Sequence, residues 1–432
     1  MIWNEAMETM DRQDIEDLQA VRLQDLVKRV CDAVPFYKNK FDEANLQPGA
    51  VKDLSSLSRL PFTVKDDLRD HYPFALFAEP MNRVVRLHAS SGTTGKPTVV
   101  GYTREDLDIW AEVCARSLAL AGGKPGEMFQ NAYGYGLFTG GLGMHYGAEK
   151  MGMTVIPVSG GNTGRQILLI RDFGPHMMAC TPSYALTLVD RLRAEKVDPE
   201  SINLKTFLLG AEPWTEEMRS AIEARFPVKA VNIYGLSEII GPGVSNECIE
   251  ARDGSHVFED HFIVEAINPN TGQPVPDGKQ GELVFTTLTK QAMPLIRYRT
   301  GDLASINRTP CICGRTHARM SRITGRVDDM LIIRGVNVFP SQIESVIVAI
   351  PQLSPHHLIE VSREQHLEQL TIKVEIAKDL GDETSLRQTV STQAIKGLKE
   401  ILGINVKLSI QPQGSIPRSE GGKLNRVVRV QV

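Results

Sequence analysis

The sequence predicts an α/β protein with a large N-terminal domain and a small α+β C-terminal domain. Between residues 153 and 234, short apolar runs alternate with amphipathic helices, which is typical of a mostly parallel sheet covered by helices. Near residue 255 the helices stop and apolar runs separated by turns predict a β-rich subdomain. The last part of the chain mixes strands with a helix at the size of a small α+β domain. We therefore expect two domains, of which the second is formed by about the last hundred residues.

The N-terminal part is predicted to be helical. Apolar residues recur there at helical spacing among charges until Pro35, which we expect to stop the helix. A second amphipathic helix is predicted from Thr103 to Leu120, because Thr103 and Asp106 form a near capping box at its start.

The alternating part and the β-rich part follow in order. The predicted strands are Met153–Ile156, Met177–Cys180, Thr206–Leu209, Val231–Tyr234, Phe262–Ile267 and Glu282–Thr287, and the helices among them are Arg165–Arg171, Tyr184–Lys196 and Thr215–Arg225. In the C-terminal domain, strands are predicted at Leu370–Ile376 and Val406–Ile410 with a helix between them.

Composition excludes several classes of protein. A chain of 432 residues exceeds what one core usually supports, and 42% apolar with 23% charged residues is ordinary for a globular enzyme. The net charge of −4 gives no support for binding nucleic acid or a membrane surface. No apolar run is long enough to span a membrane, and the N-terminus lacks a secretion signal. Six cysteines in so long a chain indicate a reducing compartment, so we expect a cytoplasmic protein.

The most informative stretch is the loop Ser90–Pro97. It carries four hydroxyl side chains, two glycines and Lys96, directly after an apolar alternating run. Glycines let successive backbone N–H groups point into one concavity, and hydroxyls and a lysine add donors and charge, so the loop suits a polyphosphate. It lacks the spacing of a Walker A loop. The alternative is a flexible, hydroxyl-rich surface loop.

A second motif, Tyr234–Glu238, follows a predicted strand. Open α/β sheets bind ligands at the carboxyl ends of their strands, where the carboxylate of Glu238 could hold Mg²⁺ against phosphate oxygens. The alternative is a helix start, with Ser237 as the cap and Glu238 in the first turn.

Three further motifs follow toward the C-terminus. Asp302, at the end of Tyr298–Asp302, could accept hydrogen bonds from both ribose hydroxyls of a nucleotide, or lie in an ordinary Gly-Asp turn. Gly and Asp residues interrupt apolar sequence in Thr324–Met330, and the stretch Arg334–Pro340 follows, which suggests a hinge between domains. Lys423, preceded by two glycines, lies on a predicted mobile loop or on an exposed tail.

A possible zinc site is predicted around a Cys-x-Cys-Gly sequence. Cys311 and Cys313 suit thiolate ligation of Zn²⁺, which in closed structural sites takes four nitrogen or sulfur ligands. Cys248 and His256 could complete the set, and His317 is the rival fourth ligand. The alternative is two reduced cysteines in a turn.

In this order, the five stretches around Lys96, Glu238, Asp302, the hinge and Lys423 resemble the adenylate-forming superfamily of acyl-CoA synthetases and ligases. The resemblance covers nearly the whole chain, and the collinear set is far more specific than any one motif. Further segments resemble the phenylacetate–CoA ligase subfamily: Trp3-Asn4, Pro61–Lys65, Ala132–Gly141, Glu259–Phe262 and Arg334–Pro340.

The resemblance implies roles for individual residues. Domain 1–327 would bind AMP and form the acyl-adenylate, and domain 328–432 would be the mobile lid. Lys423 and Glu238 would be catalytic, Glu238 through Mg²⁺. ATP or AMP would bind Ser90, Ser91, Gly92, Thr93, Thr94, Gly95, Lys96, Gly210, Ala211, Glu212, Pro213, Tyr234, Gly235, Ser237, Asp302 and Arg326. The aryl acid would bind Tyr133, Phe138, Gly210, Ala211, Ile233 and Pro242; the hinge would be Asp328, and coenzyme A would lie near Arg334 and Gly335.

The function implied by this resemblance is ATP-dependent ligation of phenylacetate, or a close aryl acid, to coenzyme A, with release of AMP and pyrophosphate. Two alternatives stay open: an aryl-adenylating enzyme that loads a carrier protein, and a nucleotide-binding protein without turnover. A nucleic-acid-binding role for the Cys-x-Cys element is disfavoured by the absence of a basic stripe. The preferred acid and the oligomeric state, for which a homodimer is one expectation, are not fixed by the sequence.

Overall fold

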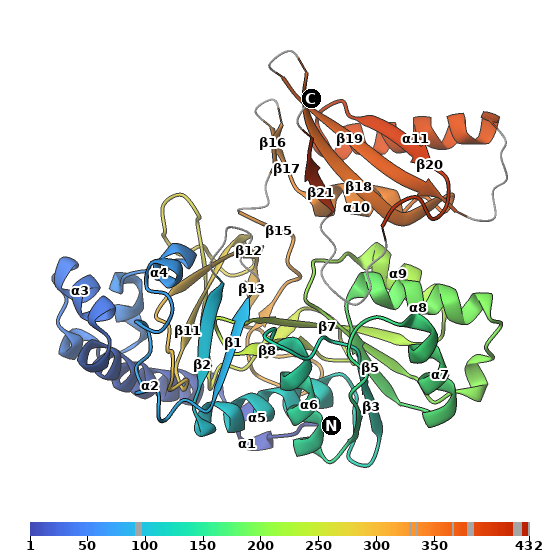
Figure 1. Ribbon diagram of the computed structural model, residues 1–432. Coiled ribbons are helices and arrows are strands. Elements are labelled where there is room, and N and C mark those ends of the chain that lie inside the picture. The colour runs from blue at the N-terminus through green and yellow to red at the C-terminus, as the bar shows by residue number, and fades with distance from the viewer. Residues whose placement is uncertain are drawn as a thin grey trace.

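The computed structural model describes residues 1–90, 97–327, 331–333, 336–364, 367–377, 384–417 and 426–430. Figure 1 shows a large body made of the N-terminal and central parts of the chain, with a smaller body, containing α10, α11 and β16–β21, above it. The predicted α/β architecture is confirmed. In the described residues, no helix combines the length and the apolar character that crossing a membrane requires.

Helices form the first part of the chain. They are α1 (Glu5–Glu8), α2 (Arg12–Ala33), α3 (Pro35–Glu43) and, after two short 3₁₀ segments (Pro48–Ala50 and Leu54–Arg59), α4 (Lys65–Asp70). Pro35 ends α2 as predicted but also begins α3, because a proline at the first helical position loses no intrahelical hydrogen bond.

A nine-stranded sheet crosses the described part of the large body, in the order β13-β14-β9-β8-β7-β6-β5-β3-β4. The predicted parallel sheet is confirmed for β3 (Met128–Asn131), β4 (Thr154–Ile156), β5 (Met177–Cys180), β6 (Thr206–Leu209) and β7 (Lys229–Leu236). The other strands are antiparallel: β8 (Gly241–Glu247), β9 (Ser255–Val257), β13 (Ile306–Asn307) and β14 (Arg319–Met320). The direction of pairing therefore changes at β7, next to the Tyr234–Glu238 motif.

Helices pack on this sheet through two apolar clusters. The first cluster takes in residues of α5 (Arg104–Leu120) and α6 (Gly140–Met151), and the second takes in residues of α7 (Thr163–Phe173), α8 (Pro182–Ala194) and α9 (Glu216–Arg225). The predicted capping box of α5 is present, because Asp106 N donates to Thr103 Oγ1 and Thr103 N donates to Asp106 Oδ2. This fixes the start of the helix that lies beneath β8.

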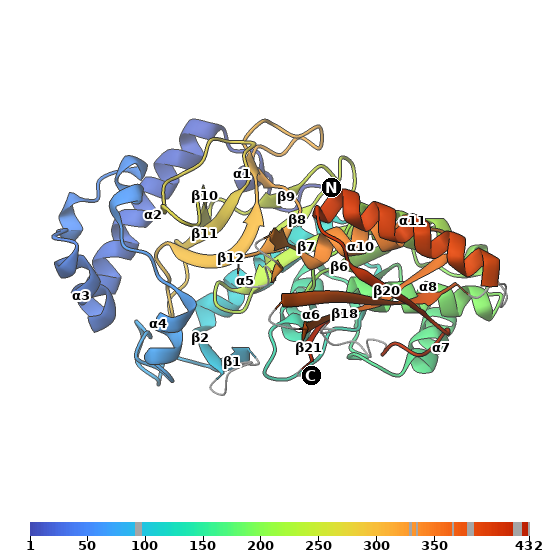
Figure 2. The ribbon, with the colours of Figure 1, turned by 90° about the horizontal axis from the view of Figure 1, so that it is seen from above.

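The β-rich subdomain is a second, antiparallel sheet in the order β10-β11-β12-β15. Its strands are β10 (Phe262–Ile267), β11 (Gly281–Thr287), β12 (Tyr298–Ala304) and β15 (Gly325–Arg326). A separate antiparallel pair, β1 (Arg86–Ser90) and β2 (Thr98–Tyr102), brackets the predicted phosphate loop, with Ser90 opposite Thr98. Figure 2 shows β1 and β2 on the same side of the molecule as α4, apart from β10.

The small body has its own apolar cluster, which runs from Leu331 to Val406. It contains the pair β16 (Leu331–Ile333) and β17 (Val336–Val338), the helices α10 (Pro340–Val348) and α11 (Thr384–Leu402), and the strands β18 (Leu353–Glu364), β19 (Leu367–Ile376), β20 (Lys407–Gln411) and β21 (Val427–Arg429). Its sheet has the order β20-β19-β18-β21. Helix α10 packs against α9, so the two bodies meet there (Figure 1).

Candidate functional site

The end of β7 brings together residues from three of the predicted motifs. Tyr234 Oη donates to Asp302 Oδ2 at 2.7 Å, and Arg326 Nη1 lies 2.5 Å from Asp302 Oδ1. Asp302 on β12 is directly opposite Arg326 on β15. Burial, and then the neighbouring Asp302 carboxylate, raise the pKa of Tyr234 well above its usual value, so its hydroxyl stays a donor. Asp302 is therefore a buried carboxylate held by a phenol and a guanidinium.

The segment after β7 carries Ser237 and Glu238, both buried. Ser237 Oγ lies 3.0 Å from Thr139 Oγ1, at the start of α6. The Glu238 carbonyl accepts a hydrogen bond from the ammonium group of Lys290, which the sequence analysis did not single out. Burial lowers the pKa of Lys290 to about 8, against the opposing effect of Asp106 and Glu238. Two contacts thus hold the segment between β7 and β8: one at the side chain of Ser237 and one at the backbone carbonyl of Glu238.

The Gly210–Pro213 loop follows β6 and lies beside the end of β7. A Cβ atom on Gly210 would be 2.3 Å from the Ile233 carbonyl oxygen, so only glycine allows this approach. Ala211 has φ +72°, and the Glu212 carboxylate accepts from Ser183 N at 2.7 Å, at the start of α8. The loop is therefore held against the strand ends where a ligand would bind.

The residues predicted to bind the acid come from the same region. The Tyr133 hydroxyl lies 3.5 Å from the Leu208 carbonyl oxygen, and Tyr133 and Phe138 both lie close to Gly140. Tyr133 is 3% exposed, whereas Phe138 is 38% exposed. Pro242 on β8 is opposite Gly235 on β7. One aromatic ring is thus buried and the other reaches the surface.

Several predicted residues lie outside the described part of the chain. They are Ser91, Gly92, Thr93, Thr94, Gly95, Lys96, Asp328, Arg334, Gly335 and Lys423.

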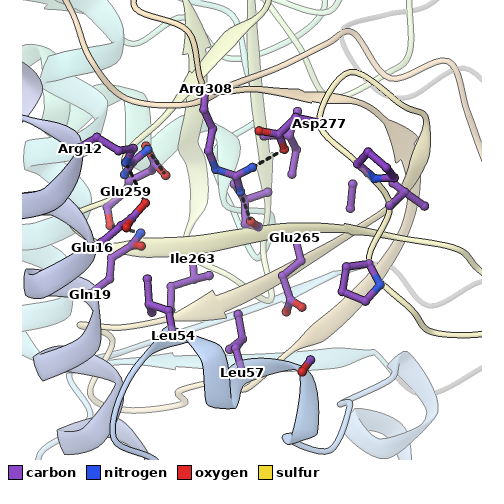
Figure 3. Close-up of a pocket in the computed structure, with 17 residues that line it drawn as sticks. Arg12, Glu16, Gln19, Leu54, Leu57, Glu259, Ile263, Glu265, Asp277 and Arg308 are labelled. Atoms are coloured by element: carbon purple, nitrogen blue, oxygen red, sulfur yellow. Dashed lines mark hydrogen bonds and ion pairs between the residues drawn. The ribbon is translucent and has the colours of Figure 1, made fainter.

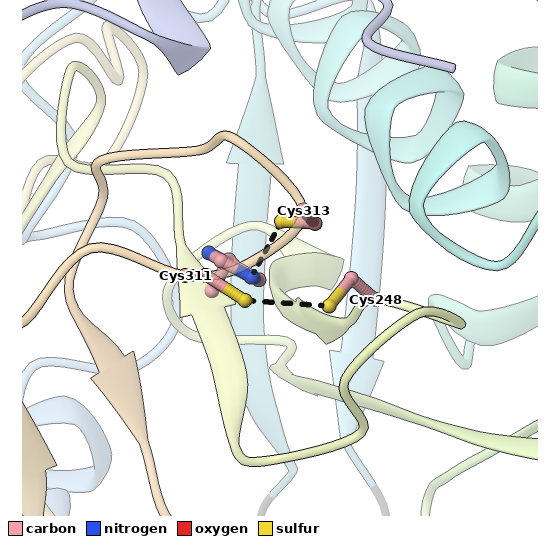
Figure 4. A group of neighbouring side chains, drawn as sticks. Cys248, Cys311 and Cys313 are labelled. Atoms are coloured by element: carbon pink, nitrogen blue, oxygen red, sulfur yellow. Dashed lines mark hydrogen bonds between the residues drawn. The ribbon is translucent and has the colours of Figure 1, made fainter.

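The predicted metal ligands lie together (Figure 4). The Sγ atoms of Cys248 and Cys311 are 3.7 Å apart, and Cys313 Sγ is 3.5 Å from His256 Nε2. The four possible ligand atoms all lie within 4.8 Å of one another. His317, the rival fourth ligand, is not one of the four; it is buried next to Asp260 and Glu259, and burial lowers its pKa.

An ion pair and hydrogen bonds join the N-terminal segment to the loop that carries Cys311 and Cys313. The side chains of Glu8 and Arg315, 0% and 1% exposed, form an ion pair. Glu8 also accepts from the backbone N–H groups of Trp3 and Asn4, and its carbonyl accepts from Thr316 N at 3.1 Å. The cysteine loop and the first ten residues thus form one unit.

A cavity of about 400 Å³ lies elsewhere, between α2, the 3₁₀ segment Leu54–Arg59 and β10 (Figure 3). Arg12 pairs with Glu259 and Arg308 pairs with Asp277 in its lining. None of its lining residues was predicted to bind substrate, so it does not compete with the site at the end of β7.

Comparison with known proteins identifies the family. The sequence matches the AMP-binding enzyme family over residues 14–289 and the AMP-binding enzyme C-terminal domain over residues 335–430. A phenylacetate-coenzyme A ligase from Thermus thermophilus is 54% identical over 99% of this chain and 99% of its own, and one from Escherichia coli is 52% identical over 98% and 97%. The chain belongs to the phenylacetate–CoA ligase family of AMP-binding enzymes. The resemblance stated from the sequence is confirmed.

Solved structures of a related ligase extend the comparison. 2-Hydroxyisobutyryl-CoA ligase in the postadenylation state, in complex with R3-HIB-AMP, is 28% identical, and the match covers 98% of this chain and 91% of that one with a TM-score of 0.92. The same ligase with 2-HIB-AMP and CoA in the thioesterification state is 29% identical, with coverages of 99% and 92% and a TM-score of 0.73. Of these two structures, the one in the postadenylation state thus superposes better on this chain.

Proposed function

We propose that this protein ligates phenylacetate, or a close aryl acid, to coenzyme A at the expense of ATP. The acid first forms an acyl-adenylate with release of pyrophosphate, and the thiol of coenzyme A then displaces AMP. The observation that carries the proposal is the convergence of Tyr234, Asp302 and Arg326 at the strand ends beside Gly210 and Glu238. The high identity to phenylacetate-coenzyme A ligases supports the choice of acid.

The first half-reaction requires a weak nucleophile to attack phosphorus within a polyanion. A carboxylate oxygen attacks the α-phosphorus, and the bond from that phosphorus to pyrophosphate breaks, so cations and donors must be placed where charge accumulates. In our proposal the Ser90–Lys96 loop grips the β- and γ-phosphates, Asp302 and Arg326 hold the ribose, and Lys423 bridges the α-phosphate and the carboxylate. Tyr234, Gly235, Ser237 and the Gly210–Pro213 loop would complete the AMP site.

The aryl acid would lie between the buried Tyr133 ring and the backbone of the Gly210–Ala211 loop. Ile233 and Pro242 would add apolar contacts, and the partly exposed Phe138 would close the outer side. Rings with small residues opposite them suit a flat aryl group.

The second half-reaction needs other groups around the same carbonyl. The thiol sulfur attacks the acyl carbon, the bond to AMP breaks, and the thiol proton leaves to solvent. We propose that domain 328–432 turns about Asp328, withdraws Lys423, and brings Arg334 and Gly335 beside the pantetheine. The separate apolar cluster of the small body and the family match over 335–430 support treating 328–432 as a domain distinct from 1–327.

Glu238 is the residue proposed to hold Mg²⁺. Mg²⁺ prefers oxygen ligands and is usually bound by one or two carboxylates together with substrate phosphates, which fits a single carboxylate at the strand ends. When bound, the ion would neutralise charge on the phosphate oxygens.

We also propose a structural zinc ion at Cys248, His256, Cys311 and Cys313. A tetrahedral site with usual zinc distances has edges of about 3.8 Å between two sulfurs and about 3.6 Å between sulfur and nitrogen. Two of the six separations between the ligand atoms, 3.7 Å and 3.5 Å, fit those edges, and all six are within 4.8 Å. A closed three-cysteine, one-histidine set has no open position for substrate, so the zinc would have no catalytic role.

We further propose that the enzyme is cytoplasmic and acts without nucleic acid or membrane partners. All six cysteines are free thiols, which suits a cytoplasmic enzyme, and the net charge of −4 gives no reason to expect nucleic acid or membrane partners. A homodimer stays a prediction that sedimentation would test.

Release of pyrophosphate from ATP and a panel of aryl acids, with and without coenzyme A, tests the function. We expect release with phenylacetate and sustained turnover only when coenzyme A is added. Turnover that needs a carrier protein instead would favour the carrier-loading alternative, and ATP binding without any release would favour a non-catalytic protein.

The two half-reactions can be separated with Lys423→Ala. Loss of one such transition-state contact costs about 3–4 kcal/mol, so we expect adenylation to fall by hundreds-fold. Thioester formation from supplied acyl-adenylate should be retained. Lys399→Ala, at an exposed position of α11 in the same domain, serves as a control. Equal losses in both half-reactions would contradict this assignment.

A further inference from the structure

Three alternate backbone carbonyls of the segment 238–242, which follows β7 and includes the start of β8, accept hydrogen bonds from side chains distant in the sequence. Lys290 Nζ donates to the Glu238 carbonyl at 3.5 Å, and Tyr102 Oη donates to the Ile240 carbonyl at 3.0 Å. Trp110 Nε1 donates to the Pro242 carbonyl at 3.0 Å. The first and last of these carbonyls belong to the residues proposed to hold Mg²⁺ and to line the acid pocket.

The three donors are stacked on one another. Lys290 Nζ lies 4.6 Å from the centre of the Tyr102 ring, and the Tyr102 and Trp110 rings are stacked at 4.9 Å with 14° between their planes. His88 packs edge-on against both rings, at 5.6 Å and 5.5 Å. We call Lys290, Tyr102 and Trp110 the donor column. Each member of the column donates to one carbonyl only, so the three carbonyls are held at three separate points.

The donor column is inside the protein. Tyr102, Trp110 and Lys290 are 0%, 1% and 1% exposed. A buried ammonium is expensive unless charges and hydrogen bonds compensate it, and here Asp106 and Glu238 do so together with the face of Tyr102. Apolar residues would fill such a position at less cost, so the lysine needs a reason other than packing.

The fit at the other end of the column is tight. A Cβ atom on Gly241, next to Pro242, would be 2.5 Å from the Trp110 ring, and Cys114 Sγ also contacts the Pro242 carbonyl, at 3.3 Å. A change at Trp110 is therefore transmitted to Pro242 rather than absorbed by empty space.

We propose that Lys290 and Trp110, joined through Tyr102, are positioning residues that set the two ends of the segment separately. Lys290 fixes Glu238 for the phosphates and their metal ion, and Trp110 fixes Pro242 for the acid. This inference rests on the proposed roles of Glu238 and Pro242.

Kinetic constants for each substrate, together with calorimetric affinity for MgATP, test the inference. We expect Lys290→Met to weaken MgATP binding and raise its KM by at least about tenfold, because it removes a charged donor, while KM for the acid is unchanged. Trp110→Phe should raise KM for the acid by up to about tenfold and leave MgATP binding unchanged. Tyr102→Phe keeps the stack and loses one donor, so both effects should be small.

Gln19→Met is the matched control. Gln19 Nε2 also donates from a buried site to a backbone carbonyl, that of Glu259 at 2.8 Å, which is not one of the three carbonyls held by the donor column. We expect it to lower the melting temperature without changing either KM. If Lys290→Met does not fold, Lys290→Gln keeps a donor without the charge and must still weaken MgATP binding alone.

Lower melting temperatures with wild-type KM values, or equal changes in both KM values, would overturn the inference. These outcomes can be distinguished from those that would contradict the proposed function. If the wild-type protein adenylates no aryl acid, the proposed function is wrong, yet MgATP affinity of the Lys290 variants still decides the role of Lys290.

Discussion

Removal of the proposed zinc ion should destabilise the protein, because Cys248, His256, Cys311 and Cys313 come together only in the folded chain. A metal ion that binds only the folded chain, present at a thousand times its dissociation constant, stabilises that chain by about 4 kcal/mol. A change of 1 kcal/mol moves the melting temperature of large domains by about 2–4 °C. We therefore expect Cys311→Ser and Cys313→Ser to melt about 8–16 °C below the wild type, because each leaves the set with three ligands.

Elemental analysis and melting curves on protein purified without chelators provide the assay. The wild type should carry about one zinc ion per chain, since structural sites of this composition bind one metal ion. Cys31→Ser is the matched control, because Cys31 is a buried free thiol on α2, outside the four-residue group. Its zinc content should be that of the wild type.

The choice of histidine is tested in the same experiment. His256→Gln should lose zinc and His317→Gln should keep it, because only His256 belongs to the four-residue group. Wild-type protein with no zinc, or cysteine variants with undiminished melting temperatures, would refute the site. The two thiols of the Cys-x-Cys sequence would then be ordinary reduced cysteines.

Three further side chains, those of Tyr234, His357 and Glu8, allow quantitative predictions for ATP affinity, for the pH dependence of stability and for stability itself. Tyr234→Phe should weaken ATP binding about tenfold in calorimetry, because Asp302 loses a donor at 2.7 Å; unchanged affinity would contradict the ribose role. Burial lowers the pKa of His357 to about 3, so the folded protein keeps it neutral while the unfolded chain protonates it below about pH 6.5. The free energy of unfolding should thus decrease as the pH is lowered below about 6.5. Between pH 7 and pH 5, the wild type should lose about 2 kcal/mol more of this free energy than His357→Asn does, as measured by urea unfolding. Glu8→Ala leaves the buried Arg315 unpaired and should cost about 3–5 kcal/mol in the same measurement; a loss under about 1 kcal/mol would contradict the buried pair.

Short buried strands were predictable from the sequence with little error. Met177–Cys180 and Thr206–Leu209 agree with β5 and β6 residue for residue. Each is a fully buried apolar run beside helical sequence, so local pattern and tertiary environment favour the same structure. The helix from Thr103 to Leu120 was equally clear, because its capping box is local.

Helix α6 was not predicted, for a physical reason. It contains four glycines, which disfavour a helix by their backbone entropy. A Cβ atom on Gly143 would be 2.5 Å from Trp110, and one on Gly147 would be 2.3 Å from Cys114 Cβ. These glycines permit α6 to approach α5 closely, and only the folded structure reveals that contact. Strands β8 and β9 were missed similarly, because polar residues such as Ser245 and His256 are buried there by strand pairing.

The sequence predicted which residues belong to the candidate site, but not the residues that hold them in place. Glu238, Asp302 and Cys311 were recognised from motifs that carry chemistry at short spacing. Lys290 and Trp110 lie in no motif, and their hydrogen bonds span 52 and 132 positions of the chain. No local pattern in one sequence encodes a contact of that length.

The contacts of the first ten residues cannot all form at the same time during synthesis. Glu8 leaves the ribosome early, but its partner Arg315 is translated 307 positions later. Until then the carboxylate of Glu8 lacks the Arg315 guanidinium, and the backbone carbonyl of Glu8 lacks the N–H group of Thr316. The side chains of Trp3 and Asn4, by contrast, donate to Glu112 on α5, which is translated much earlier. The N-terminal segment is therefore among the first parts to be translated, and its last contacts with the large body form only after Arg315 and Thr316 have been made.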